Sequence, residues 1–430
     1  MRLLLCIALL MPPVARAVTL EAAFARIIEN NPEVRQAKLR VEEAAGRRLV
    51  LRAVGWPDFR GNVPAGAQGG ARAGEKEVQP FAFAVGALVQ PIFDRAVMAS
   101  MRRGDIDVLL AQQRLNVAVL EQLHRARLAY YTAAYQDSLR GFAEEQRQRL
   151  EANVRAQNDR YQQGQANRHA LVSAQVLERE LTPRIEESRR ASTAALLQLA
   201  QAMGEDVRGA LPTVDDELVF ASANLDVENE TRRALEQRAD LKLARLLVRA
   251  AHEDERLAAA AYYPEIHAQI SGTYIPVTDI RRGSQGSARR SDDIVSSELR
   301  MGGGYTWRVI DNGRVGGARA RQRAVREANE AVVARLEAEV PRELTRLQNN
   351  LGALQAQHAA LIKASSVAEQ TVNAVQAQVM QGLTSQLEYR SAETDFLQTK
   401  AGLLSVAYQQ NVAFAERDRI TGRYFKFEAP

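Results

Sequence analysis

The fold is decided by a stretch that occurs twice, as Trp56-Pro57-Asp58-Phe59 and, 207 residues later, as Tyr263-Pro264-Glu265-Ile266. Upstream of it the same offset aligns Glu33-Val34 with Asp240-Leu241, Ala37 with Ala244, Val41 with Val248, and Ala44 with Ala251. Downstream, Val89-Gln90-Pro91-Ile92-Phe93-Asp94 corresponds to Trp307-Arg308-Val309-Ile310-Asp311, and Gln163-Gly164 to Gln381-Gly382. Self-similarity of this kind indicates one structural unit present in two copies.

The spacings between matched residues separate a variable loop from parts of fixed length. The matched proline and the matched aspartate are 37 residues apart in the first copy and 47 in the second. The next interval, up to the glycine of Gln-Gly, is 70 or 71 residues, and the last, up to Gly204 or Gly422, is 40 in both copies. We therefore expect a loop in the first interval and rigid elements in the other two.

The fixed intervals predict helices of unusual length. Between Asp94 and Gly164 there is no proline, and apolar residues recur every three to five positions among Gln, Arg, Ala and Glu. Seventy helical residues span roughly 105 Å, and helices of this length are typical of coiled coils. The pattern resumes after Gly164 and ends near Gly204, which suits a glycine C-cap, and the second copy behaves alike up to Gly422.

Each copy also opens with a shorter helix of about 24 residues, which ends at the repeated stretch. Asn31 suits the N-cap of the first of these helices, and Pro32 suits its first turn. Pro183 and Pro341 fall inside predicted helices, where they should produce a kink or another departure from regular geometry.

Between the helices, both copies switch to the alternation of apolar and small or polar residues that is typical of strands. The predicted strands are Phe59 to Val63, Phe81 to Val89, Ile266 to Ser271 and Leu299 to Val309. The longer ones have about ten residues, the length of a tilted strand that crosses a bilayer. The linkers Pro64 to Gly74 and Thr278 to Asp293 are predicted to be exposed hairpin loops.

The first 17 residues have the pattern of an export signal, with Arg2, an apolar run and an Ala15-Arg16-Ala17 ending before Val18. Two repeats follow. The predicted domains are residues 18–223, with a strand pair near 57–92 and a helical hairpin at 94–204, and residues 224–430, with a strand pair near 264–310 and a hairpin at 313–422.

Composition and charge exclude several classes of protein. With 46% hydrophobic and 25% charged residues, the chain is folded rather than disordered. Cleavage after Ala17 would leave 413 residues with 55 basic and 52 acidic side chains, a net charge of about +3. This basic excess is too small to indicate a nucleic-acid-binding surface. Cleavage would also remove Cys6, so we expect neither a disulfide nor a lipidated N-terminus.

The predicted class is mainly α with a β-barrel portion, built from duplicated long α-helical hairpins and four strands per chain. Past the signal, no apolar stretch approaches the roughly 20 residues of a membrane helix, so a membrane would have to be crossed by strands. Four strands cannot close a barrel, and lipid does not tolerate open strand edges. Three chains would supply twelve strands, an even number within the range of outer-membrane barrels.

The chain resembles the TolC-type outer-membrane efflux proteins over nearly its whole predicted mature length. The resemblance rests on Asn30-Asn31-Pro32-Glu33-Val34, Val89-Gln90-Pro91-Ile92-Phe93-Asp94, Ile310-Asp311-Asn312-Gly313-Arg314, Tyr161-Gln162-Gln163-Gly164 and Gln381-Gly382-Leu383-Thr384-Ser385. It implies a homotrimer whose 12-stranded barrel lies in outer-membrane lipid and continues as a periplasmic α-helical barrel. It also implies two partners, a periplasmic adaptor (membrane fusion protein) and an inner-membrane pump of the RND, ABC or MFS type.

The resemblance assigns adaptor binding to the turns between the long helices. The residues concerned are Gly164, Gln165, Asn167, Gly382, Leu383 and Thr384. For the two glycines a purely structural interpretation stays open, because glycine permits the left-handed turn between antiparallel helices.

The resemblance also implies a periplasmic constriction just past the second turn. Relatives carry aspartates six and nine residues after the glycine, and here these positions are Glu388 and Ser391. Three copies of Glu388 around an axis would attract cations. A solvated glutamate on a helix face is the alternative, and Ser391 departs from the acidic pattern.

No catalytic, metal or cofactor site is predicted. No nucleophile, base and orienting group converge in the sequence. His252-Glu253-Asp254-Glu255 has the composition of a metal cluster, but no second histidine lies nearby, so we interpret it as a solvated helix face.

We therefore expect the exit duct of a tripartite efflux system, which conducts passively and is not an enzyme. The exit channel of a type I protein-secretion system is the alternative within the same class. A periplasmic coiled-coil scaffold without a channel is the alternative from another class, and the alternating segments argue against it.

Overall fold

The computed structural model describes residues 17–72, 75–205, 211–214, 218–222, 224–276 and 295–423. The predicted loop at 278–293 and the predicted export signal, apart from Ala17, lie outside these residues. The chain divides into two compact units. Unit 1 comprises Met1–Leu39, Gln113–Lys242 and Ala334–Pro430, and unit 2 comprises Arg40–Gln112 and Leu243–Val333.

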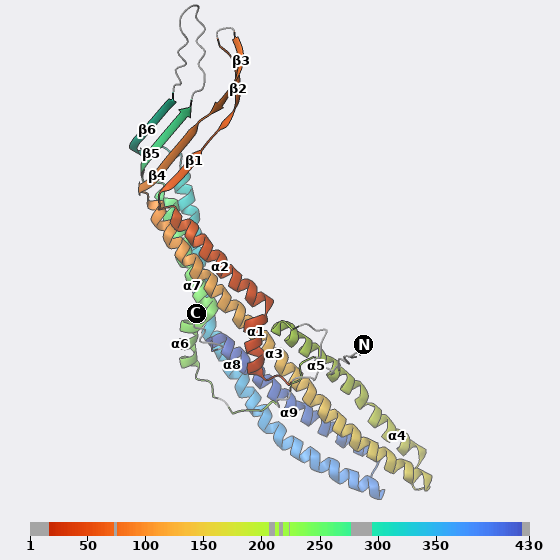
Figure 1. The fold of residues 1–430 in the computed structure, drawn as a ribbon. Coiled ribbons are helices and arrows are strands. Elements are labelled where there is room, and N and C mark those ends of the chain that lie inside the picture. Colours follow the sequence, from red (N-terminus) through yellow and green to blue (C-terminus); the bar gives the residue numbers. More distant parts are fainter. Residues whose placement is uncertain are drawn as a thin grey trace, which may run out of the picture. The chain divides into compact units, whose positions relative to one another are not determined.

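Helices form most of the described chain (Figure 1). They are α1 (Leu20–Asn30), α2 (Pro32–Ala53), α3 (Arg95–Gln162), α4 (Arg168–Arg179), α5 (Leu181–Met203), α6 (Val227–Gln237), α7 (Ala239–Ala260), α8 (Arg314–Gln381) and α9 (Gln386–Thr421). The strands are β1 (Asp58–Asn62), β2 (Ala65–Arg72), β3 (Glu75–Ala82), β4 (Ala84–Phe93), β5 (Glu265–Pro276) and β6 (Val295–Thr306). Among the described residues, no helix combines the length and apolarity needed to cross a bilayer.

The predicted long helices are confirmed, since α3 and α8 each contain 68 residues. An aspartate stands at the start of each: Asp94 Oδ1 accepts a hydrogen bond from Ala96 N (2.7 Å), and Asp311 Oδ2 accepts one from Val315 N (2.7 Å). The predicted glycine C-caps are confirmed too. Gly204 ends α5 with φ of +71°, and Gly422 ends α9 with φ of +69°.

The two prolines behave differently. The helical run after the first turn breaks at Glu180, between α4 and α5, and Pro183 follows three residues later. This break agrees with the prediction, because the proline ring clashes with the carbonyl four residues before it. Pro341, by contrast, lies inside α8, which continues through it without a break.

Unit 2 contains an antiparallel sheet in the order β1-β4-β5-β6. The four strands were predicted, and Gly86 of β4 pairs with Gly61 of β1 and with Gly272 of β5. The prediction of a loop over Pro64 to Gly74 was wrong in part, because β2 and β3 form a two-stranded ribbon with Ala65 opposite Ala82. A Gly- and Ala-rich strand carries no apolar alternation, so its pairing is not visible in the pattern. Residues 307–309 also lie beyond the end of β6.

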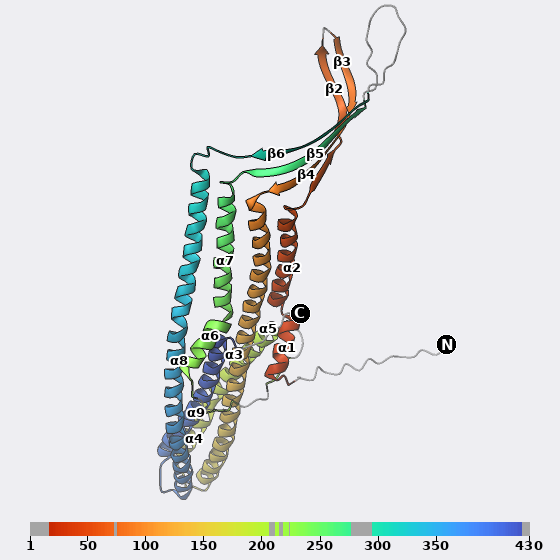
Figure 2. The same cartoon turned by 90° about the vertical axis from the view of Figure 1, so that its left-hand side faces the viewer.

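The helical part of unit 2 is a row in which α3 lies between α2 and α7, and α7 lies between α3 and α8 (Figure 2). Ion pairs join the neighbours, with N–O distances of 2.6 Å for Arg48–Asp105, 2.8 Å for Arg103–Asp254 and 3.1 Å for Arg326–Glu255. The interpretation of residues 252–255 as a solvated face was therefore wrong for the acidic residues. Asp254 and Glu255 bind neighbouring helices, and Glu253 is buried and binds Arg256 at 2.7 Å.

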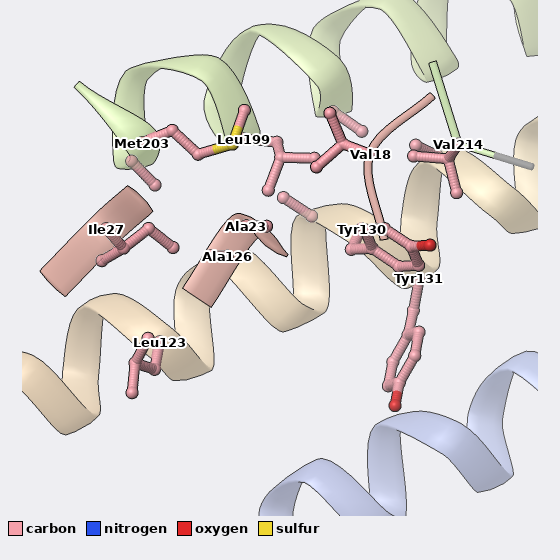
Figure 3. Packing of buried hydrophobic residues seen from close by; sticks show 14 of the residues in the cluster. Val18, Ala23, Ile27, Leu123, Ala126, Tyr130, Tyr131, Leu199, Met203 and Val214 are labelled. Atoms are coloured by element: carbon pink, nitrogen blue, oxygen red, sulfur yellow. The ribbon is translucent and has the colours of Figure 1, made fainter. Parts of the chain in front are cut away.

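The largest buried cluster of unit 1 lies where α1, α3 and α5 meet (Figure 3). Ile27 of α1, Leu123 of α3, and Leu199 and Met203 of α5 have no exposed surface, and Tyr130 of α3 is almost completely buried. Residues from distant parts of the first repeat thus share one core, which fixes α5 against α3.

Candidate functional site

The first hairpin turn of unit 1 follows α3. Gly164 has φ of +73°, the left-handed conformation that glycine adopts without strain. The N–H of Gln165 donates to the carbonyl of Arg160 at 2.8 Å, which closes the end of α3. Asn167 then caps α4, because its Oδ1 accepts from Ala170 N at 2.8 Å. Gln165 and Asn167 are both exposed.

The second turn has the same construction between α8 and α9. Gly382 has φ of +76°, and the N–H of Leu383 donates to the carbonyl of Gln378 at 2.9 Å. Ser385 caps α9, with its Oγ 3.2 Å from the N–H of Glu388. Thr384 Oγ1 donates to the Glu388 carboxylate. The sequence Ser385-x-x-Glu388 has the spacing of a capping box. Glu388 therefore has a structural role at the N-terminus of α9.

Arg160 joins the two turns. Its Nη1 donates to the carbonyl of Val379 in the last turn of α8 at 2.6 Å. A Cβ atom on Gly382 would lie 3.0 Å from Arg160 Nη2, so the arginine also lies against the second turn. A cation at a helix C-terminus is favourable because the last carbonyls carry partial negative charge. The sequence analysis missed this contact: the arginine is visible near the end of α3, but its partner is 219 residues away.

Apolar side chains surround the turns and point to solvent. Leu383 and Leu387 are both 74% exposed, and Tyr161 and Met380 are more than two-fifths exposed. Exposed apolar side chains of this size, gathered at the end of a hairpin, are typical of a surface that binds another protein. Ser391 and Glu388 are exposed as well, on the first turns of α9.

Further contacts fasten the hairpins to each other behind the turns. Arg390 of α9 forms an ion pair with Glu180. Asn153 Nδ2 of α3 donates to Gln386 Oε1 of α9 at 3.3 Å, and the rings of Phe142 and Phe396 meet edge to face with centroids 5.8 Å apart. These contacts make the α3–α4 and α8–α9 hairpins one connected body within unit 1.

A buried carboxyl group lies about one and a half turns of α9 beyond Glu388. Glu393 is only 1% exposed, and burial raises its pKa to about 7, while Arg149 acts in the opposite direction. The sequence analysis missed Glu393. A signal was present, because Tyr389, Glu393 and Phe396 share the spacing of one helix face and the two aromatic residues are apolar anchors.

The structure offers no metal centre in the residues it describes, since no three His, Cys, Asp or Glu side chains there lie close enough to hold an ion.

The comparison with protein-family models identifies one family. The family model described as outer membrane efflux protein matches residues 24–205 and 231–423. A search of curated proteins found no match.

Several solved structures share the fold. Their sequence identities to this chain are low, so the likeness shows the fold and nothing more. The outer membrane channel CmeC of Campylobacter jejuni is 14% identical, with a TM-score of 0.79 over 96% of this chain and 87% of that one. VceC of Vibrio cholerae is 16% identical, with a TM-score of 0.79 over 94% and 96%. The open state of the MtrE channel of Neisseria gonorrhoeae is 18% identical, with a TM-score of 0.74 over 94% and 88%.

The family model covers both repeats, and the solved channels reproduce the duplicated hairpins and the sheet. The fold class expected from the sequence, mainly α with a β portion and duplicated long hairpins, is therefore confirmed. The chain belongs to the outer membrane efflux protein family.

Proposed function

We propose that the chain is the exit duct of a tripartite efflux system in the outer membrane, and that it conducts substrates passively after an inner-membrane pump delivers them. The duct is a homotrimer whose twelve-stranded barrel lies in lipid and whose helices extend into the periplasm. A periplasmic adaptor connects it to the pump.

The sheet of unit 2 is the observation that carries this proposal. It leaves β1 and β6 as open edges, and large apolar side chains stand exposed on both, among them Phe59, Leu299 and Met301. Unpaired strand edges favour pairing with another chain, and lipid accommodates strands only in a closed sheet. Three copies that pair β6 with β1 would remove both open edges of this four-stranded sheet.

The hairpin turns of unit 1 are the proposed docking site for the adaptor. Gly164 and Gly382 shape the turns, and Leu383 and Thr384 supply an apolar and a polar contact, with Gln165 and Asn167 beside them. The support is the exposure of Leu383 together with the rigidity that Arg160 gives to the pair of turns.

Glu388 is the proposed constriction, with Ser391 one turn further along α9. In a trimer three carboxylates would face a common axis and attract cations. The contact from Thr384 holds the carboxylate near the turn, so any movement of the second turn would carry the charge with it.

Single-channel conductance of the detergent-extracted protein in a planar bilayer tests the duct. We expect discrete conductance steps from the wild type, and in Glu388→Ala larger steps or a weaker preference for cations. Glu369→Gln is the matched control, because Glu369 is an exposed carboxylate on α8, and it should conduct like the wild type.

The outcomes separate the parts of the proposal. Conductance that does not respond to Glu388→Ala would retain the duct and reject the constriction. A folded trimer without conductance, even after the turns are loosened by Arg160→Ala, would favour the scaffold.

Adaptor docking is tested separately, with the purified periplasmic adaptors of the same organism. Leu383→Asp should weaken co-purification of the adaptor by at least tenfold, because it places a charge in an apolar contact. Val219→Asp is the control: Val219 is 72% exposed but lies in the segment between α5 and α6, away from the turns, so adaptor binding should persist. Equal losses in both variants would contradict docking at the turns.

A further inference from the structure

Helices α3 and α9 of unit 1 meet along a seam that joins the two repeats, and the end of the seam far from the turns is fully paired. Arg127 Nη1 binds Asp418 Oδ2 at 2.7 Å, and both side chains are largely buried. Closer to the turns, the Tyr135 and Tyr408 rings stack with centroids 4.8 Å apart, and Thr132 Oγ1 lies 3.1 Å from the Tyr408 hydroxyl. This half of the seam satisfies its polar groups and fixes the register of the helices.

The half of the seam near the turns is built differently. Polar side chains are buried there at core positions, and several of their atoms have no hydrogen-bond partner within the described part of the chain: Gln157 Nε2, Gln386 Nε2 and Glu393 Oε2. Buried polar atoms without partners destabilise a contact by about 1–3 kcal/mol each. These unpaired atoms weaken this half of the seam relative to an arrangement in which every polar group is paired.

Glu393 lies at the start of this weak half. In the amide orientation that satisfies both neighbours, Gln146 of α3 donates to Glu393 Oε1 and accepts from Arg149 Nη2 at 2.6 Å. Arg149 is thus linked to the carboxylate through Gln146 rather than by direct contact. Its guanidinium also lies 5.5 Å from the Phe396 ring centroid and 3.4 Å from Glu145 Oε1.

Among the described residues, Arg149 is the one whose charge shifts the pKa of Glu393. The apolar cluster in this region of unit 1 includes Leu177 from α4, Leu181 from α5 and Val372 from α8. On α9 itself, Arg390 is paired with Glu180, and Lys400 lies 5.8 Å from the Phe396 ring centroid. Tyr389 adds a phenol whose pKa burial raises, so it stays neutral. An ionised Glu393 has only the distant charge of Arg149 to compensate it.

We propose that Glu393 is a proton-operated latch of the α3–α9 seam: its neutral carboxyl holds the turn-proximal halves of the two hairpins together, and its ionisation releases them. The latch concerns a contact within one chain, so it does not depend on conduction.

The direction of the pH effect follows from linkage. The carboxyl pKa is about 7 in the closed seam and near its ordinary value of 4.5 once the seam opens to water. The closed seam therefore binds the proton more tightly. The stability that the raised pKa of Glu393 contributes to the closed seam is fully present below pH 4.5 and is lost as the pH rises through 7.

Hydrogen exchange of the intact, detergent-extracted protein tests the latch. Protection factors, which remove the intrinsic pH dependence of exchange, are measured between pH 5.5 and 8.5 for peptides covering 146–162 and 386–397. We expect wild-type protection to fall on the order of tenfold over this range. Peptides around Tyr408, in the paired half of the seam, should change little.

Two variants assign the effect to Glu393. Glu393→Gln imitates the neutral carboxyl, so its protection should stay high and independent of pH. Arg149→Gln retains the carboxyl but removes the one cation that favours its charge, so the loss of protection should move to higher pH. This second variant keeps the test open if Glu393→Gln does not fold. The control Glu369→Gln should follow the wild type.

Protection that is independent of pH in the wild type would overturn the latch. A pH dependence that persists in Glu393→Gln would also overturn it, because another group would then be responsible. The latch would also be overturned if protection in Arg149→Gln were lost at the same pH as in the wild type, or at a lower pH.

Discussion

In both repeats the last helix of the hairpin packs against the short opening helices. The backbone contact at this junction is the same in the two repeats, but the side chains beside it differ. In the first repeat, Gly204 lies so close to α1 that a Cβ atom would be 2.6 Å from the carbonyl oxygen of Asn30. In the second, Gly422 approaches Gln237 at the end of α6, with 3.0 Å for the corresponding distance. The backbone contact is the same, and it requires glycine in both copies.

The polar groups beside that contact differ. Asn31 in the first repeat is buried among amides, and its Nδ2 donates to the carbonyl of Ala202 at 2.7 Å. The equivalent position in the second repeat is Arg238, whose guanidinium binds Glu343 at 2.6 Å and Asp240 at 2.8 Å. The fold therefore determines the backbone approach strictly, whereas it accepts either neutral amides or a buried ion pair next to it.

The largest effect is expected from adding a methyl group at the two glycines. Gly204→Ala should lower the free energy of unfolding by about 3–4 kcal/mol and Gly422→Ala by about 2 kcal/mol, because both force alanine into a left-handed conformation and the first also collides with a backbone oxygen. Guanidinium unfolding of the detergent-solubilised protein, followed by its helical signal, measures both. Equal losses would mean that the first junction relaxes to the spacing of the second.

A second test removes the charge that distinguishes the repeats. Arg238→Met leaves Asp240 and Glu343 facing each other without a cation and should cost about 3 kcal/mol. Asn31→Ala loses a helix cap and leaves the Ala202 carbonyl unpaired, which should cost about 1–2 kcal/mol.

The neutral triple variant Arg238→Met, Asp240→Asn, Glu343→Gln controls for the loss of packing around Arg238. It should regain most of the stability that Arg238→Met loses, because no buried charge is then left unpaired. A triple variant as unstable as the single one would show that packing, not charge, sets the cost.

Acid should weaken the second junction more than the first. Burial lowers the pKa of His124, and the charge of Glu416 acts against this. Burial by itself would raise the pKa of Glu416, but the hydrogen bond from Arg419 and the nearby positive charges together outweigh it, so this pKa is lowered. Both groups bind protons less tightly in the folded state, so stability is lost as the pH falls below 6.5 for the histidine and below 4.5 for the glutamate. Hydrogen exchange should show residues 227–242 losing protection in this range before residues 20–37. Simultaneous loss would contradict the assignment.

The smallest effect is expected at two glycines in the long helices, one in each repeat. Gly141 of α3 and Gly352 of α8 lie inside helices, and no atom lies within 4 Å of a Cβ atom added at either. Alanine at each should raise the free energy of unfolding by about 0.5–1 kcal/mol. The same unfolding experiment measures both, and destabilisation at one of them would indicate that a second copy packs there.

Local rules were sufficient to predict much of the architecture. A run bounded by aspartate and glycine defines both α3, which contains no proline, and α8, which continues through Pro341, because the caps and the helix propensity act within a few residues. Asn31 as an N-cap was predicted for the same reason and is confirmed, with Val34 N donating to its Oδ1 at 3.1 Å.

What the sequence analysis missed depends on partners far away in the chain. Ribbon β2–β3 is held by ladder pairing rather than by alternation. Arg160 acts on a carbonyl of the other hairpin, and Glu393 is buried by residues of several helices. A charged residue in a helix is expected to be solvated, and the helix face that Glu393 shares with Tyr389 and Phe396 was the one local sign that it is buried.

The break at Glu180 also gives the two hairpins different mechanical properties. The return arm of the first hairpin consists of two shorter rods, α4 and α5, while the return arm of the second is a single rod of 36 residues, α9. Pro183 has no N–H to donate to the carbonyl of Arg179, so we expect the first arm to bend more easily at this joint than α9 does along its length. We therefore expect the second hairpin to be the stiffer of the two under a force applied at its turn.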